Sequence, residues 1–280
     1  MAETRDPYLY LTDSIFQEVG ELETYFLNQR IEGGHIRQSG LMRYASLPSV
    51  LTARGIEQCA NQYTVLTNQR VGNQERGGWS HIQNSRPKLL FPINPAVGSS
   101  HVKDGLVLYE VTPEMFVTNE VYPYGFIHGH PGNEPLSVTD ISLVTGSHQE
   151  VNALACLAGA RRFNSLLLAT QETINESPEE MTKRFISLYP GLKEEGMSLA
   201  ERDWDIVFGD EKGEAGDLVL DVLNGNAQSY YADLALIQEA AQYYKFGFYI
   251  SNRDGIYMLQ TKKRIFELVN SVLDEAQSLV

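Results

Sequence analysis

The chain has few cysteines and no long apolar run, and each shortage excludes a class of protein. Only two cysteines, Cys59 and Cys156, occur among its 280 residues, so it can hold neither a disulfide framework nor a Cys-x-x-Cys metal site. No apolar stretch approaches the roughly 20 residues of a membrane-spanning helix. The N-terminal sequence MAETRDPYLY lacks the charged and apolar regions of a signal peptide. We therefore expect a soluble, cytoplasmic protein with reduced thiols and no membrane partner.

Positive charge is also scarce. Lys and Arg number 22 against 36 Asp and Glu, which gives a formal net charge of -14 and a pI of about 4.9. Nucleic-acid binding needs clustered Lys and Arg, so we expect no nucleic-acid partner. The acidity is typical of a well-solvated surface, although it would also suit a basic protein partner. Composition gives no indication of the oligomeric state.

The hydrophobic patterns interleave helices with strands, which indicates an α/β or α+β class. Helical patterns cover residues 14–30, 49–60, 229–246 and 262–280, and further helices are predicted to begin near Ser137, Glu150 and Ser177. Strand patterns cover residues 62–68, 88–94, 105–111, 121–128, 164–170, 205–208 and 217–223. Residues 246–260 are predicted to form a hairpin that turns at Asp254-Gly255. Residues 152–160 are interpreted as a packed helix, which would make Cys156 an inert core thiol.

One stretch, GFIHGHPGNEPLSVTD at residues 125–140, combines residue types that suit a metal. Side chains two residues apart on a strand share a face, so His128 and His130 point together. Pro131 cannot continue a central ladder and therefore places both imidazoles at the end of the strand. Asp140 follows Ser137 by one helical turn. Two neutral imidazoles and a carboxylate make a three-ligand zinc site with a fourth position open to water.

Less specific interpretations of this stretch remain. A histidine at a strand end is usually an ordinary polar residue, and a His-x-His pair alone is weak evidence for a metal. The added proline, serine and aspartate favour a zinc site formed by His128, His130 and Asp140. A zinc deaminase is excluded, because it needs His-x-Glu and a later Pro-Cys-x-x-Cys.

The same stretch resembles the signature of the JAMM/MPN metalloproteases, also called the JAB domain. Their pattern is a strand that ends in His-x-His-Pro, a short loop, and Ser-x-x-Asp at the start of a helix. The resemblance implies that His128, His130 and Asp140 are zinc ligands and that Ser137 helps to hold the tetrahedral intermediate. One departure is the loop of six residues, 131–136, between His130 and Ser137, where the family has seven.

The family also uses a catalytic glutamate on an earlier strand, in a Glu-x-x-Gly context. Glu75 in NQERGGWSHI has Gly78 three residues later, so the resemblance implies that Glu75 is the general base. Glu110 and Glu120 are the alternatives. A glutamate beside two glycines can also be a plain turn residue.

The resemblance implies a JAB/MPN-like mixed sheet flanked by helices. Residues 1–45 would be an N-terminal helical segment and residues 46–172 the metalloprotease core. Residues 173–280 would be an insertion followed by a closing hairpin and helix, or a separate C-terminal domain. The implied activity is Zn²⁺-dependent hydrolysis of an amide bond in a peptide or a ubiquitin-like conjugate. Two alternatives stay open, a catalytically inactive scaffold or binding module and a metal-dependent small-molecule amidohydrolase.

Overall fold

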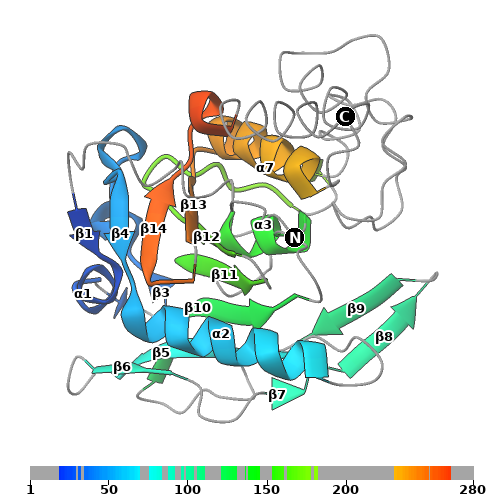
Figure 1. Ribbon diagram of the computed structural model, residues 1–280. Helices are drawn as coiled ribbons and strands as arrows, with labels where there is room; N and C mark the ends of the chain where they lie inside the picture. The colour runs from blue at the N-terminus through cyan, green and yellow to red at the C-terminus, as the bar shows by residue number, and fades with distance from the viewer. Residues whose placement is uncertain are drawn as a thin grey trace, which may run out of the picture.

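The structure is a computed structural model (Figure 1). It describes residues 19–29, 31–32, 35–69, 76–83, 88–91, 96–97, 99–103, 106–110, 121–130, 136, 138–145, 153–160, 163–177, 180–181, 230–251 and 253–265. Several of the predicted features lie outside these residues: Glu75, Glu120, Ser137, and the strand patterns at 205–208 and 217–223.

A curled, mixed sheet of ten strands is the centre of the described structure, and together with its flanking helices it makes the fold α+β (Figure 1). The strand order is β1-β4-β14-β13-β12-β11-β10-β5-β6, and β7 pairs with β5. Two pairs are parallel, β1 with β4 and β10 with β11, and the others are antiparallel. In sheet order the bounds are β1 Val19–Glu21, β4 Val50–Thr52, β14 Ile256–Leu259, β13 Gly247–Ser251, β12 Asn164–Leu168, β11 Ala155–Gly159, β10 Val121–Gly129, β5 Arg76–Gln83, β6 Lys88–Leu90 and β7 Ala96–Val97.

Two small antiparallel pairs lie outside this sheet. They are β2 (Ile31–Glu32) with β3 (His35–Ile36), and β8 (Ser99–Lys103) with β9 (Leu106–Glu110). The described helices are α1 Leu22–Leu27, α2 Arg54–Gln69, α3 Val138–Val144 and α7 Tyr230–Tyr244, with 3-10 turns at Gln38–Gly40 and Tyr44–Ser46.

Helices α2 and α3 cover opposite faces of the sheet. α2 packs on β10 and β11, and a Cβ added to Gly129 or Gly159 would lie 2.6 to 2.7 Å from backbone atoms of this helix. The side-chain positions of Gly129 and Gly159 therefore face α2. Neighbouring strand residues point to the other face, and α3 packs against β11 and β12 there.

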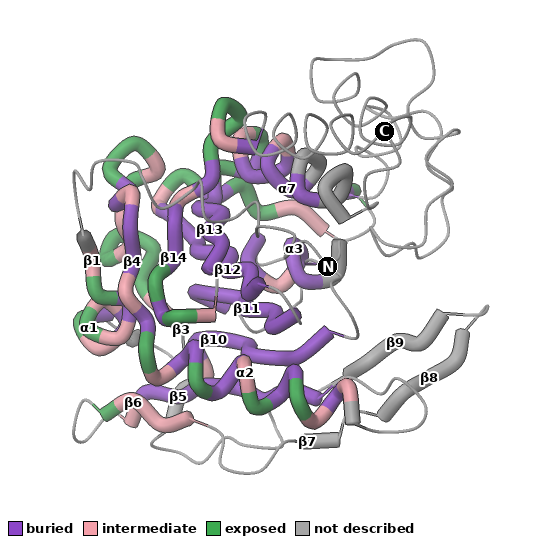
Figure 2. The backbone as a smooth tube through the Cα atoms, viewed as in Figure 1, coloured by how far each residue is buried: buried purple, intermediate pink, exposed green. Residues whose placement is uncertain are grey.

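The three central strands β11, β12 and β13 are buried at every position (Figure 2). A strand covered on both faces needs apolar side chains on both, which explains the unbroken run of leucines in β12. The surrounding core contains large buried aromatic side chains from several elements: Phe26, Tyr124, Phe163, Tyr244, Phe246, Phe248 and Tyr249.

Several of the predicted elements are confirmed. The hairpin β13–β14 turns at Asp254-Gly255, where Gly255 has φ of +83° and the Asp254 carboxylate accepts the Ile256 N–H at 2.9 Å. Helix α7 occupies residues within the predicted 229–246. Ser177 and Glu180 form a reciprocal capping box, with N···O distances of 3.4 and 3.1 Å.

Four predicted elements differ from the structure. Residues 62–68 were predicted as a strand but lie in α2, because Tyr63, Thr64 and Thr67 are buried at helical spacing while Val65 is 46% exposed. Residues 155–159 form strand β11 where a helix was predicted. Alanine and leucine favour a helix, but pairing and burial between two strands outweigh this local propensity.

The other two differences lie in the N-terminal part. Strand β1 at Val19–Glu21 interrupts the helix predicted over 14–30, so α1 begins only at Leu22. The helix predicted over 49–60 begins at Arg54, because Val50–Thr52 pair with β1 and β14.

Strands from all three predicted segments share the central sheet. β1 comes from residues 1–45, and the hairpin β13–β14 from residues 173–280 lies between β12 and β4. The boundaries at 45/46 and 172/173 stay a prediction. Among the described residues, no helix is both long enough and apolar enough to cross a membrane.

Candidate metal centre

Strand β10 presents both histidines at its end. His128 is the penultimate residue of β10, and His130 is the first residue after the end of this strand. The His130 N–H donates to the Gly159 carbonyl at 2.8 Å, so the pairing with β11 continues one residue past the strand. This continued pairing keeps both imidazoles on the face of the sheet opposite α2.

Helix α3 supplies the carboxylate. Asp140 is the third residue of this helix, and Ile141 and Val144 on the same helix are buried in the core. Helix α3 packs against β11, the neighbour of β10, and Asp140 in its first turn lies 3.1 and 3.6 Å from the two histidines. The helix that follows the His-x-His pair in the sequence therefore places the Asp140 carboxylate beside both histidines.

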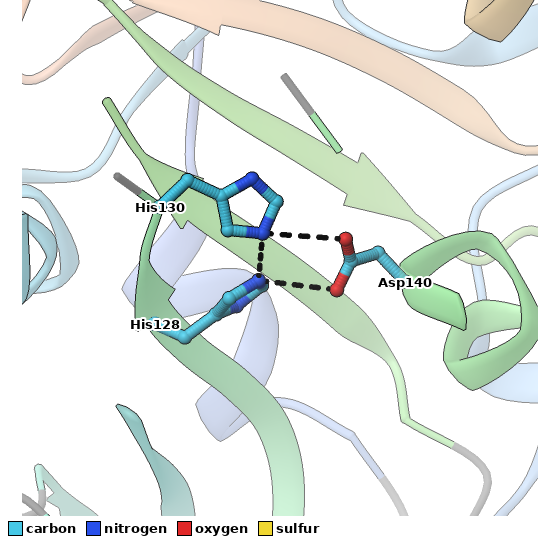
Figure 3. A group of neighbouring side chains, drawn as sticks. All are labelled: His128, His130 and Asp140. Carbon is cyan, nitrogen blue, oxygen red and sulfur yellow. Dashed lines mark hydrogen bonds and ion pairs between the residues drawn. The ribbon is translucent and has the colours of Figure 1, made fainter. Parts of the chain in front are cut away.

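The three side chains converge on one point (Figure 3). The two Nε2 atoms of His128 and His130 lie 2.8 Å apart, and they lie 3.1 and 3.6 Å from Oδ1 and Oδ2 of Asp140. Tetrahedral zinc, with bonds of about 2.0–2.1 Å, separates its ligand atoms by about 3.3 Å. The distances in the cluster bracket this value, so the donor set has the spacing of a metal site.

The cluster is shielded from solvent. His128, His130 and Asp140 expose 1%, 5% and 4% of their surfaces. The His128 ring stacks on Phe126 at 4.8 Å between centroids, and Phe126 in turn contacts Trp79 at 5.3 Å. Nδ1 of His128 is buried without a hydrogen-bond partner among the described residues. The aromatic contact and the Nε2 contacts therefore orient this ring, and the apolar surroundings strengthen any charge interaction inside the cluster.

Strand β5 packs closely against His128 on β10 and limits the positions that this histidine can take. Gly77 pairs directly with His128 across the two strands. A Cβ added to Gly77 would lie 2.6 Å from the His128 Cβ and 2.9 Å from the Ile127 carbonyl oxygen. Only glycine fits this distance, so Gly77 sets how near β5 approaches the histidine.

Of the predicted site residues, the structure brings together His128, His130 and Asp140. Glu75 and Ser137 lie outside the described residues, so their catalytic roles stay predictions. Arg76, the residue after Glu75, pairs with Gly129 between the two histidines. Glu110 is the last residue of β9, in the separate β8–β9 pair.

Sequence reasoning missed two residues of this centre. Gly77 is one of the two glycines that follow Glu75, a pattern that by itself indicates only a turn. Cys156 was predicted to be an inert thiol in a helix, and it is buried as predicted, but it lies on β11 with its Sγ 3.7 Å from Asp140 Oδ1. No pattern local to either residue signals these contacts, because both depend on which strands are neighbours.

The group His128, His130 and Asp140 could hold a metal ion. No family of proteins, no curated protein and no solved structure matches the chain.

Proposed function

We propose that the protein is a zinc metallopeptidase of the JAMM type that hydrolyses an amide bond in a peptide or a ubiquitin-like conjugate. The observation that carries the proposal is the buried convergence of His128, His130 and Asp140 at the end of one strand and the start of the next helix. The His-x-His-Pro and Ser-x-x-Asp pattern, which resembles that family, connects this geometry to peptide hydrolysis.

The donor set supports zinc as the metal. Two imidazole nitrogens and one carboxylate oxygen suit Zn²⁺ better than Mg²⁺ or Ca²⁺, which prefer oxygen ligands alone. Three protein ligands also fit a catalytic centre, since structural zinc sites use four. When bound, zinc would lower the pKa of a water molecule and polarise the scissile carbonyl.

The other catalytic roles belong to residues of the chain itself. Glu75 would accept the proton of the attacking water and later donate it to the leaving amine. Ser137 would donate a hydrogen bond to the oxygen on which negative charge develops. Both roles rest on the family resemblance. The JAB/MPN fold belongs to the same proposal, supported by an α+β sheet with α2 on one face and the candidate site on the other.

Metal content is the first test. We expect purified protein to hold about one zinc per chain in the usual three-ligand catalytic arrangement, and His130→Ala to hold much less. Elemental analysis of both proteins after dialysis against trace zinc measures this. Equal zinc content in the two would refute the metal site and the peptidase with it.

Catalysis is the second test, on a panel of linear peptides and lysine-linked ubiquitin-like substrates. Glu75→Gln should keep its zinc and lose about 10²–10⁴-fold in rate, because a general base is removed. Ser137→Ala should also keep its zinc and lose transition-state stabilisation of about 2.7–4 kcal/mol. Zinc-loaded wild type that cleaves no amide substrate would contradict the proposal and favour a scaffold.

A further inference from the structure

A buried thiol touches the carboxylate of the candidate metal centre. Cys156 pairs in register with Phe126, the residue two before His128, and therefore shares the face of the sheet on which the histidines lie. Its side chain is fully buried, and its Sγ lies 3.7 Å from Oδ1 of Asp140 as a hydrogen-bond donor. The thiol belongs to the sheet, whereas the carboxylate belongs to the short helix α3.

The thiol is placed to hold the carboxylate in its position. Asp140 reaches the histidines from the first turn of a seven-residue helix, and a small rotation of that helix would move its oxygens away from the two Nε2 atoms. Oδ1 faces both His128, at 3.1 Å, and the thiol of Cys156, at 3.7 Å. A donor fixed in a central, fully buried strand holds this oxygen in a constant direction.

Cys156 is not itself one of the metal ligands. Among the described residues, the ligand atoms that all lie within 4.8 Å of one another belong to His128, His130 and Asp140 alone. A group that hydrogen-bonds a ligating carboxylate without touching the metal typically changes metal affinity or activity by about 10–100-fold when it is removed.

We propose that Cys156 is a positioning residue that orients Asp140 for metal binding through its thiol hydrogen bond. The inference rests on the proposed zinc site, although it requires no peptidase activity. It would replace the expectation that this thiol is inert, because the Cys156 thiol donates to a candidate ligand from its place in β11.

The test measures Zn²⁺ affinity in three variants. Together they separate the effect of losing the hydrogen-bond donor from the effect of changing the side-chain volume. Cys156→Ala removes the donor and leaves a small cavity, Cys156→Val removes the donor and fills the space, and Cys156→Ser keeps a donor. We expect Cys156→Ala and Cys156→Val each to weaken Zn²⁺ binding by about 10–100-fold in competition with a chelator, and Cys156→Ser to weaken it clearly less. The visible spectrum of bound Co²⁺ should shift in Cys156→Ala and Cys156→Val, because the carboxylate would turn.

Cys59 provides the matched control. It is the other buried thiol, on α2 across the sheet, so Cys59→Ala should leave Zn²⁺ affinity and the Co²⁺ spectrum unchanged. Wild-type affinity in both Cys156→Ala and Cys156→Val, or equal losses of affinity in all three Cys156 variants, would overturn the proposal. If Cys156→Ala does not fold, the comparison of Cys156→Val with Cys156→Ser decides. Absence of Zn²⁺ binding in wild type would instead refute the proposed function.

Discussion

At the scale of single residues, the candidate site depends as much on small side chains as on its ligands. Gly77 lets β5 pass so close to His128 that an added Cβ would lie 2.6 Å from the His128 Cβ. Interiors packed at crystal density cannot absorb such an overlap without moving a strand. The position of the imidazole is therefore limited by a glycine on another strand, which lies outside the His-x-His-Pro and Ser-x-x-Asp stretch at residues 125–140.

This dependence leads to a prediction for Gly77→Ala. We expect the substitution to push β5 and β10 apart, to cost about 1–3 kcal/mol of unfolding free energy, and to weaken Zn²⁺ binding as His128 moves. Urea unfolding and chelator competition measure the two effects.

Gly125→Ala is the control for Gly77→Ala. Its added Cβ would meet the Ala155 carbonyl oxygen at 3.7 Å and the Ser80 Cβ at 4.0 Å, which are ordinary contacts. Gly125 lies on β10 whereas Gly77 lies on the paired strand β5, so Gly125→Ala tests a glycine of the same strand pair without the overlap. Equal losses of affinity in the two variants would mean that the close approach of Gly77 is unimportant.

At the scale of elements, a buried polar cluster joins α2 to the C-terminal hairpin. Glu57 on α2 is buried, and its carboxylate accepts hydrogen bonds from Ser251 at 3.0 Å and from the Tyr257 hydroxyl. Ser251 and Tyr257 are paired residues of β13 and β14. Burial, and then the adjacent Glu57 carboxylate, raise the pKa of Tyr257 well above its ordinary value, so the phenol remains a donor. The hairpin is thereby fixed to the helix that covers β10.

Removing one donor from this carboxylate should be costly. We expect Tyr257→Phe to lower the unfolding free energy by about 1.5–3 kcal/mol, the range for a hydrogen bond to a charged group. Tyr249→Phe is the matched control in the same hairpin, because its hydroxyl donates to the neutral Pro48 carbonyl at 3.0 Å. That change should cost about 0.5–1.5 kcal/mol. Denaturant titrations that rank the two variants in the opposite order would show that the Glu57 carboxylate is satisfied in another way.

At the scale of the whole molecule, a single sheet collects strands from both halves of the sequence. The hairpin β13–β14 lies between β12 and β4. Strand β5 pairs with the edge of β10 that faces away from β11. Distant parts of the chain therefore stabilise the strand that carries the histidines. His81 is a buried histidine of β5, and burial lowers its pKa to about 4. The free energy of unfolding should therefore depend on pH in the acidic range.

The direction of the pH dependence follows from linkage. An unfolded histidine has a pKa of about 6.5, so between about pH 6.5 and 4 the unfolded chain binds a proton that folded His81 does not. Stability should be full above pH 6.5 and should fall as the pH drops toward 4. We expect metal-free His81→Gln to lose less stability over this window than metal-free wild type, as measured by urea unfolding at pH 7, 6 and 5. Because the other histidines are common to both proteins, parallel curves would exclude a role for His81.

Features that depend on local chemistry could be predicted from the sequence. Strand alternation put His128 and His130 on one face, the Ser-x-x-Asp spacing put Asp140 one turn into a helix, and Asp254-Gly255 formed the hairpin turn. Each depends on backbone geometry within a few residues, which sequence spacing records directly. The interleaved patterns limited the fold class to α/β or α+β, and the mixed sheet makes it α+β.

Which elements become neighbours depends on long-range packing, so it could not be predicted from the sequence. Residues 62–68 join a helix and 155–159 a strand because burial against other elements outweighs local propensity. The partners of the candidate ligands, Gly77 from β5 and Cys156 from β11, come from strands placed beside β10 by sheet order. That order is fixed by packing of the whole core, so no short pattern in the sequence contains it.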